Sequence, residues 1–371
     1  MNAACESIRS FSPERLEELM RELGQPKFRA KQVHEWLHLH NASSYDEMTN
    51  LPKALREQLS QRFPLQETKI LQVRESQDGT KKDLLQLDDG LVVECVGILD
   101  GSGNKAQGSQ HSFGETEDDQ AVEAEDKGGR LTVCCSTQVG CAMKCSFCAT
   151  GQQGLERNLT ADEIVAQVVA VGKDFGMRVG NVVVMGQGEP FQNYDATIDA
   201  MRRMNSDAGL DIGARHITVS TSGLCEEIKR FAKEPEQFRL AISLHAAEQS
   251  TRNALMPRLS GQNLKKLRTA LAYYVEEKGR RITLEYMLLN ELNDTDDDLQ
   301  HLIAFCEGLN VHVNLLPFNA VDGIDYMPSD HRAVNKWRVA LDNAGIPCSV
   351  RKSKGSDIAG ACGQLKASRF E

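Results

Sequence analysis

The sequence predicts an α/β protein: a partial six-stranded β/α barrel preceded by a helical module and a small β-ribbon. Three patterns predict it. Apolar residues recur at helical spacing through residues 12–63, runs with a two-residue period follow, and from Leu131 short β-branched runs alternate with helical segments six times. Such alternation specifies parallel strands, and six units fit either a partial barrel or an open doubly wound sheet. In both folds the chemistry lies at the carboxyl ends of the strands.

The amino-terminal segment is expected to form three helices. Ser12 is a suitable N-cap, Pro13 occupies the first helical position, and the apolar pattern that follows ends at Gly24. The next two helices are expected over residues 27–38 and 52–63.

A β-hairpin is expected next, because the runs KKDLLQL and LVVECVGIL flank Asp89-Gly90, a dipeptide typical of tight hairpin turns. The six strand-like runs of the barrel are LTVCCST, NVVVMGQ, HITVSTS, FRLAISLH, RITLEYML and VHVNLLPF. The expected domains are a helical accessory domain (1–66), the hairpin with an acidic linker (67–130), the barrel (131–351) and a C-terminal catalytic tail (352–371).

Composition narrows the class of protein. With 40% hydrophobic and 26% charged residues, the chain is an ordinary globular protein and not a disordered one. No apolar run approaches the roughly 18 residues that span a bilayer, and the start lacks the order of a secretory signal, so a cytoplasmic protein without membrane contact is expected. Three of the 11 cysteines fall within eight residues, which indicates metal or redox chemistry in a reducing compartment.

The formal charge of −10 would argue against nucleic-acid binding if it were evenly spread. Residues 100–129 hold eight acidic and two basic residues, so most of the excess lies in one segment. That segment has a single aromatic residue and many Gly, Ser and Gln residues, and it is expected to be a flexible acidic loop. The rest of the chain is close enough to neutral to carry a local basic surface.

The cysteines Cys141, Cys145 and Cys148 form a CxxxCxxC motif directly after the first barrel strand. A β/α barrel places its active site in such a loop. Three thiolates suit a [4Fe-4S] cluster with one iron left open for a substrate, and they also suit zinc with a fourth ligand from elsewhere. The spacing favours the cluster slightly and leaves both interpretations open.

Around this motif the sequence resembles the radical SAM superfamily, in which such a loop holds a [4Fe-4S] cluster and S-adenosylmethionine (SAM) chelates the open iron. The closer resemblance is to the RlmN family of adenine-C2 RNA methyltransferases. It rests on FRAKQVHEWLH, CSTQVGCAMKCSFCATGQQGLERNLTADEIVAQV, MGQGEP, STSG, AISLHA, LPFN and DIAGACGQL. The implied fold is a TIM-like radical SAM barrel. The long acidic loop and Cys135 depart from the family pattern.

The resemblance implies a SAM site at the carboxyl ends of the strands. Its residues would be Gly188, Glu189, Ser220, Ser243, Leu244, His245 and Asn319. Taken alone, MGQGEP could be a strand-to-loop turn in which glycine lets the backbone approach a ligand, and His245 could be a buried side chain that bonds to the backbone.

Three further residues are candidates for catalysis. Cys362 lies in a Gly-rich tail, a mobile placement suited to a nucleophile, and the resemblance makes it the cysteine that accepts a methyl group. Cys134 and Cys135 are adjacent on one strand, so only one can face the barrel interior. The alternation of side chains along the strand does not tell which of the two faces inward, and the alignment with the family selects Cys134. Glu94 matches the family's proton acceptor, although a solvated carboxylate on an edge strand is the simpler interpretation of the residue alone.

The implied function is methylation of carbon 2 of adenosine in 23S rRNA and tRNA through a methyl-cysteine intermediate. A disulfide would then join Cys134 and Cys362, and an external electron donor, such as a flavodoxin-type protein, would reduce it. The basic candidates for contacts with RNA phosphates are Lys27, Arg29, Lys31, Arg351, Lys352 and Lys354, although a solvated helix face is the more common role of such residues. Three alternatives stay open: the related adenosine-C8 methyltransferase, a zinc-stabilised RNA-binding protein without enzymatic activity, and a radical SAM enzyme with a small-molecule substrate.

Deletion of residues 103–127 is expected to leave folding and catalysis largely intact, because a segment of this composition contributes little to a core. Loss of its negative charge should tighten binding to RNA, and the gain should shrink as salt is raised. The yield of soluble protein and the RNA affinity at two salt concentrations measure both effects. Insoluble protein would show that the segment is structural.

Overall fold

The computed structural model describes residues 8–38, 42, 44–63, 65, 68–100 and 129–367. The expected acidic loop therefore lies almost entirely outside the described residues. Within them, no helix has both the length and the apolar character needed to cross a membrane.

The three amino-terminal helices that the sequence pattern predicts are present, and their side chains form an apolar core of their own. They are α1 (Pro13–Glu22), α2 (Phe28–His38) and α3 (Lys53–Arg62), with 3₁₀ turns η1 (Ile8–Ser10) and η2 (Tyr45–Glu47). Ser12 caps α1 by accepting a hydrogen bond from the backbone N–H of Arg15. Arg203 joins this unit to the rest of the molecule by donating to the carbonyl oxygen of Arg9 at 3.1 Å.

Ten strands of the described chain form one sheet. In sheet order they are β1 (Lys69–Glu75), β2 (Lys81–Gln86), β3 (Val92–Asp100), β4 (Arg130–Cys134), β7 (Val179–Val184), β8 (Ile217–Thr221), β9 (Arg239–Ser243), β10 (Ile282–Leu288), β11 (Val311–Pro317) and β12 (Cys348–Val350). Strands β1 to β4 pair antiparallel, and β4 to β12 pair parallel. All six predicted barrel strands are present, whereas the sequence patterns do not predict β1 or β12.

The predicted ribbon is an extension of the barrel sheet. Its hairpin turns at Asp89-Gly90, where Gly90 has φ +81°. Strand β3 then pairs with β4, from Val96 opposite Cys134 to Asp100 opposite Arg130. Since β3 lies inside the sheet, the interpretation of Glu94 as a solvated residue on an edge strand is wrong.

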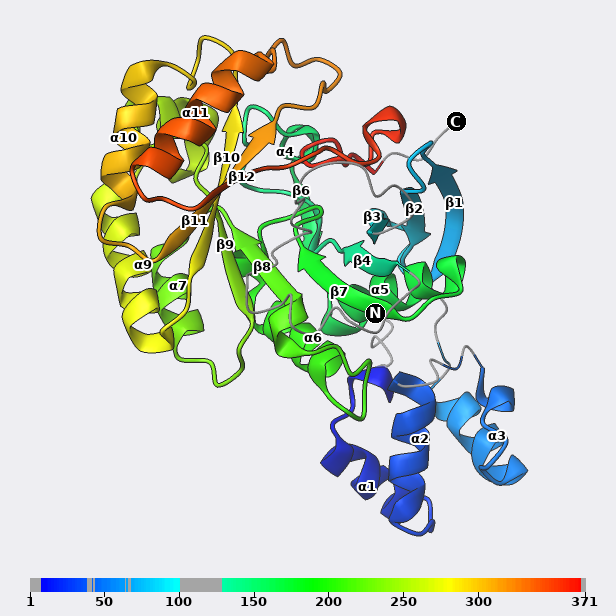
Figure 1. The fold of residues 1–371 in the computed structure, drawn as a ribbon. Coiled ribbons are helices and arrows are strands. Elements are labelled where there is room, and N and C mark those ends of the chain that lie inside the picture. Colours follow the sequence, from blue (N-terminus) through cyan, green and yellow to red (C-terminus); the bar gives the residue numbers. More distant parts are fainter. Residues whose placement is uncertain are drawn as a thin grey trace.

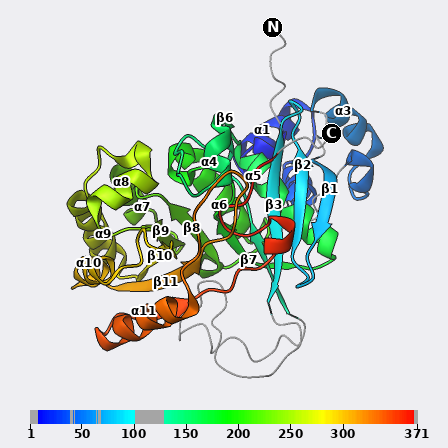
Figure 2. The same ribbon diagram turned by 90° about the horizontal axis from the view of Figure 1, so that it is seen from above.

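Helices cover the outer face of the curved sheet, and the inner face lines the lumen of an open barrel (Figures 1 and 2). The helices that accompany the sheet are α5 (Ala161–Phe175), α6 (Tyr194–Asn205), α7 (Cys225–Ala232), α8 (Gln249–Leu255), α9 (Leu264–Lys278), α10 (Asp296–Cys306) and α11 (His331–Asn343). Outer-face side chains such as Val133, Ile242 and Leu284 form the main apolar core. Because side chains alternate along a strand, their neighbours face the lumen.

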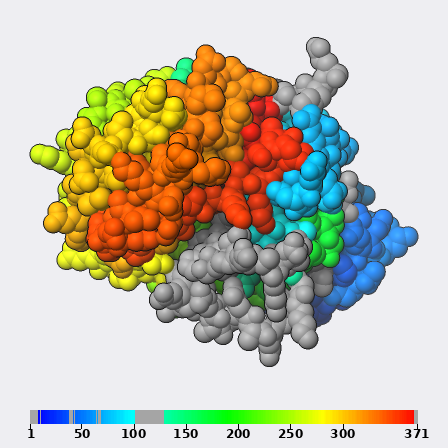
Figure 3. All heavy atoms as spheres, turned by 45° about the horizontal axis from the view of Figure 1, so that its top comes forward, coloured from blue at the N-terminus to red at the C-terminus, as the bar shows by residue number. Residues whose placement is uncertain are grey.

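The segment after β12 crosses the open side of the barrel toward the ribbon strands. Gly355 N donates to Asp78 Oδ2 at 3.0 Å, and Ser76 Oγ donates to Asp357 Oδ1 at 2.6 Å. In Figure 3 this red segment fills the surface between the orange α11 region and the light-blue strands β1 to β3. The tail is therefore docked against the sheet.

Substitution of Gly97 by Ala is expected to destabilise the protein by about 1–3 kcal/mol through overpacking. A Cβ at this position in β3 would lie 2.3 Å from Phe175 and 2.6 Å from Val171, both on α5. Gly261→Ala is the matched control, since its Cβ would meet nothing within 4 Å. Urea unfolding of both variants measures the difference, and equal stability would contradict the packing of α5 on the ribbon.

Candidate active site

The three-cysteine loop is held between the strands of a short hairpin. Strand β5 (Gln138–Gly140) leads into it, and α4 (Ala149–Gln153) and β6 (Leu155–Asn158) follow it. Cys141 N donates to Gly154 O at 2.8 Å. Gly140 has φ +76°, and a Cβ on it would lie 1.9 Å from that same carbonyl oxygen. The entry to the loop therefore requires glycine.

The thiols of Cys141, Cys145 and Cys148 are unbridged and pack in one apolar cluster with Phe147. Burial raises the pKa of Cys141 to about 12. Burial also raises the pKa of Cys145, and the positive charge of Arg252 opposes that rise. No three His, Cys, Asp or Glu side chains of the described chain converge on the position of one metal ion. Three free thiols on a single loop match the donor set of a [4Fe-4S] cluster, in which each cysteine binds a different iron.

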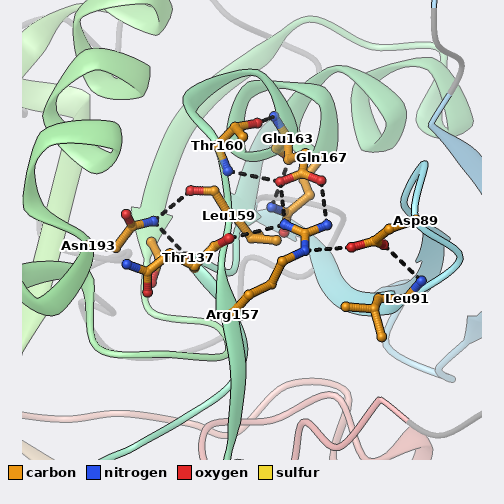
Figure 4. A network of polar contacts seen from close by, with 10 residues as sticks. Asp89, Leu91, Thr137, Arg157, Leu159, Thr160, Glu163, Gln167 and Asn193 are labelled. Atoms are coloured by element: carbon orange, nitrogen blue, oxygen red, sulfur yellow. Dashed lines mark hydrogen bonds and ion pairs between the residues drawn. The ribbon is translucent and has the colours of Figure 1, made fainter. Parts of the chain in front are cut away.

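Arg157 on β6 connects the hairpin of this loop to two other parts of the barrel (Figure 4). Its guanidinium forms two hydrogen bonds with Glu163 at 2.8 and 2.9 Å, and its Nε donates to Asp89 at 2.6 Å. Glu163 also belongs to the capping box of α5 with Thr160. One side chain thus fixes the β2–β3 turn and the start of α5 around the cysteine loop.

Glu189 joins the loops that follow β7 and β8. Its Oε1 accepts from Thr221 Oγ1 at 2.6 Å and from Phe191 N at 3.0 Å, and its Oε2 accepts from Ser222 N at 2.7 Å. Burial raises the pKa of Glu189, and these hydrogen bonds oppose the rise. At Gly188, φ is +106° and a Cβ would lie 2.7 Å from Gln138. The GQGEP turn is therefore closely packed, and Oε2, which accepts one hydrogen bond, keeps a lone pair for a ligand.

Ser220 and Ser243 face the lumen from neighbouring strands, with their hydroxyl oxygens 3.4 Å apart. Leu244 is buried in the outer core. His245 follows with φ +56°, a conformation that non-glycine residues rarely adopt. Its Nδ1 accepts from Met287 N at 3.1 Å, which leaves the proton on Nε2. Burial, together with Arg252, lowers its pKa to about 3, so the ring is neutral.

The tail places Cys362 beside these residues. Asn319 Nδ2 donates to Cys362 O at 3.3 Å, Ala149 N donates to Gly363 O at 2.8 Å, and Thr150 Oγ1 donates to Leu365 O at 2.6 Å. The expected mobile placement of Cys362 is thus replaced by a docked one. Burial raises the pKa of its thiol, and Arg351 opposes this.

Cys134 and Cys135 point to opposite faces of the sheet. Cys134 lies with Val183 and Leu365 on the lumen side, whereas Cys135 belongs to the outer core. Burial raises the pKa of Cys134, and so does the negative charge of a nearby Cys362 thiolate. The two thiols are unbridged. Only Cys134 therefore faces the same space as Cys362.

Glu94 and Lys82 form a buried ion pair beneath the tail. Glu94 Oε1 lies 2.9 Å from Lys82 Nζ, and their side chains are 1% and 6% exposed. Lys82 Nζ also donates to Ala359 O at 3.1 Å, and Lys366 N donates to Glu94 Oε2 at 2.8 Å. The pair thus holds the tail at two points that flank Cys362.

Three of the basic residues named from sequence as RNA contacts form ion pairs within the protein. Arg351 Nη1 lies 3.9 Å from Glu285 Oε2, Lys354 Nζ lies 3.0 Å from Asp100, and Lys27 Nζ lies 2.9 Å from Glu17. Sequence reasoning missed Lys82 and Glu285. A lone carboxylate inside the apolar run TLEYML was a signal for Glu285, whereas the three adjacent charges of KKD gave none for Lys82.

Comparison with known proteins identifies the family. A family model described as "Radical SAM superfamily" matches residues 135–306, and one described as "Ribosomal RNA large subunit methyltransferase N-terminal domain" matches residues 7–65. A Lysinibacillus sphaericus (strain C3-41) protein, "Probable dual-specificity RNA methyltransferase RlmN", is 40% identical over 98% of this chain and 89% of the relative. A Staphylococcus aureus (strain JH9) protein of that name is 41% identical over 98% of this chain and 93% of the relative. The chain belongs to the RlmN family.

A crystal structure of a radical SAM methyltransferase from Sphaerobacter thermophilus has the same fold as this RlmN family member. The TM-score is 0.86 at 40% identity, over 98% of this chain and 99% of that chain. The chain is therefore an enzyme, a radical SAM methyltransferase whose cofactors are a [4Fe-4S] cluster and SAM. The alternative of a zinc-stabilised protein without enzymatic activity is wrong.

Anaerobically reconstituted protein is expected to hold about four iron and four sulfide per chain. Replacement of Cys141, Cys145 or Cys148 by Ala should remove the cluster, because each thiolate would bind a separate iron. Cys134→Ala is the control and should retain it. Iron and sulfide assays with the visible absorption spectrum measure the outcome. Stoichiometric zinc without iron in the wild type, or a full cluster in all three loop variants, would contradict the assignment.

Proposed function

We propose that this enzyme methylates carbon 2 of adenosine in RNA, with 23S rRNA and tRNA as substrates, through a methyl group carried on Cys362. Its curated relatives bear the name dual-specificity RNA methyltransferase. The observation that carries the proposal is the docking of the tail that bears Cys362: Leu365 packs with Cys134 of the first barrel strand, and Gly363 O accepts from Ala149 N directly after the three-cysteine loop. Direct transfer of the methyl group from SAM to a substrate would use neither thiol.

The target atom requires radical chemistry. Carbon 2 of adenine belongs to an electron-poor amidine and is not nucleophilic, so it does not displace a methyl group from a sulfonium. When bound, the cluster supplies the electron that releases a 5′-deoxyadenosyl radical from SAM. We assign the cluster to Cys141, Cys145 and Cys148. The residues assigned to SAM are Gly188, Glu189, Ser220, Ser243, Leu244, His245 and Asn319.

The protein's own thiols carry the methyl group. Cys362 takes it from one SAM and becomes a thioether. Loss of one hydrogen atom to the radical leaves a carbon radical on this methyl group, which adds to carbon 2. The adduct then loses the proton of carbon 2, for which Glu94 is the proposed acceptor, and one electron, which the oxidised cluster would take back when bound. To take that proton, Glu94 has to exchange its hydrogen bond from Lys366.

The Cys134 thiolate then attacks the Cys362 sulfur. The bond from that sulfur to the methylene breaks, the methylene takes a proton, and 2-methyladenosine leaves as a disulfide forms. Two electrons from an external donor, such as a flavodoxin-type protein, reduce the disulfide. We place this cycle in the cytoplasm.

The substrate nucleotide has to leave its stack before it reaches the lumen. The related C8 methyltransferase would use the same two thiols, so the product distinguishes the two activities. Mass spectrometry of nucleosides from RNA treated with SAM and reductant is expected to detect 2-methyladenosine. Detection of 8-methyladenosine alone would overturn the choice of carbon 2.

Substitutions at the two cysteines should fail at different steps. Cys362→Ala removes the methyl acceptor, so neither methylated RNA nor a covalent species should form. Cys134→Ala keeps methyl acceptance and radical addition but removes the thiol that releases the product, so enzyme covalently joined to RNA should accumulate. Denaturing gels of each variant with RNA, SAM and reductant, before and after ribonuclease digestion, measure both outcomes.

Cys135→Ala is the internal control, because Cys135 packs in the outer core and should leave turnover in place. Normal turnover in either redox variant, or an adduct in Cys362→Ala, would refute the scheme. An adduct in Cys135→Ala with normal turnover in Cys134→Ala would assign the releasing thiol to Cys135.

A further inference from the structure

Glu285 is a buried carboxylate that the steps above do not use. It lies on β10, where the side chains of Leu284 and Tyr286 belong to the outer core, so Glu285 faces the lumen. Its exposed fraction is 5%. Backbone N–H groups of Leu244 and His245 both donate to its carbonyl oxygen, at 3.0 and 3.2 Å, which fixes the strand at this point.

The two carboxylate oxygens of Glu285 differ in their contacts. Oε1 accepts a hydrogen bond from Asn314 Nδ2 at 3.1 Å. Oε2 is buried and accepts no hydrogen bond from any described residue; Arg351 Nη1, at 3.9 Å, is beyond hydrogen-bond distance. A buried acceptor without a donor loses its hydration with nothing in return, which is unfavourable. Such an atom in a functional lumen indicates a missing partner.

The surroundings of Oε2 indicate what that partner is. Glu285 lies opposite Ser243 in the β9–β10 register, and it is close enough to Cys362 to raise the pKa of that thiol. Arg351 already supplies a positive charge beside the carboxylate. A neutral hydrogen-bond donor therefore fits Oε2 better than a second cation.

We infer that Glu285 binds adenosine, its Oε2 accepting a hydrogen bond from a ribose hydroxyl or from the exocyclic amine. This rests on the proposed function, in which both SAM and the target nucleotide bring adenosine to Cys362. An ionised carboxylate only accepts hydrogen bonds, and these groups are the donors of a neutral adenosine. Binding experiments distinguish the two sources.

Glu285→Gln is the first test variant, because it keeps the shape of the side chain and removes the charge. Asp83→Asn is the matched control. Asp83 is also buried, and neither of its carboxylate oxygens is hydrogen-bonded within the described chain. Its charged neighbours are Lys81 on β2 and Asp174 on α5, away from the lumen. Glu285→Asp keeps the charge beside Arg351 and withdraws the oxygen by one methylene. If Glu285→Gln does not fold, Glu285→Asp still tests whether Oε2 binds adenosine.

Two affinities are measured on anaerobically reconstituted protein with wild-type iron content. The first is the affinity for SAM, from equilibrium dialysis. The second is the affinity for an RNA stem-loop that carries at the target position either adenosine or purine riboside, which lacks the exocyclic amine. Loss of one charge-assisted hydrogen bond should weaken one of them about 10- to 100-fold. A weaker SAM affinity assigns Glu285 to SAM. A weaker RNA affinity assigns it to the nucleotide, and to its amine if purine riboside removes the difference between wild type and variant.

Asp83→Asn should bind both ligands as the wild type does. Affinities within twofold of wild type in Glu285→Gln and Glu285→Asp, with only a lower melting temperature, would overturn the inference and leave Glu285 a structural residue. Equal weakening in Asp83→Asn would overturn it as well. Wild-type protein that leaves RNA unmethylated would instead refute the proposed function, and the SAM measurement would still test Glu285.

Discussion

The buried ion pair between Lys82 and Glu94 joins the ribbon strands to the C-terminal tail, and the geometry around Cys362 depends on it. Neither charge is solvated, so each requires the other, and removal of one would leave a buried charge without compensation. Lys82 also donates to Ala359 O, and Glu94 also accepts from Lys366 N. The tail is thus bonded on both sides of Cys362, and the thiol is brought to the lumen.

Strand periodicity provides the second constraint. Helices seal the outer face of the sheet, so apolar side chains fill that face, whereas most polar side chains of the strands face the lumen, together with a few apolar ones such as Val183. Cys134, Ser220, Ser243 and Glu285 share the lumen for this reason, although they come from four different strands. The extension of the sheet by β3 adds Glu94 to the same neighbourhood and keeps it from solvent. The alternation of side chains along each strand therefore brings these functional side chains together in the lumen.

Strained and tightly packed loops complete the site at the carboxyl ends of the strands. Gly140 and Gly188 have positive φ angles and leave no room for a Cβ, and His245 adopts the left-handed region despite its side chain. Such backbone is stable only where surrounding contacts hold it, here the β5–β6 hairpin, the Glu189 hydrogen bonds and the Met287 N–H. The loops are consequently held in place around the three cysteines by contacts within the chain.

The sequence by itself determined the six barrel strands, the three amino-terminal helices with the Ser12 cap, the hairpin turn and the three-cysteine loop, because each follows from local periodicity or from turn chemistry. Tertiary structure decided what depends on partners distant in the chain. The choice between Cys134 and Cys135 required the register of β4 against its neighbours, and the burial of Glu94 required β3 to pair with β4. The docking of the tail required Lys82, some 280 residues from it. Local patterns carry no information on such pairings, since they form only when the sheet assembles.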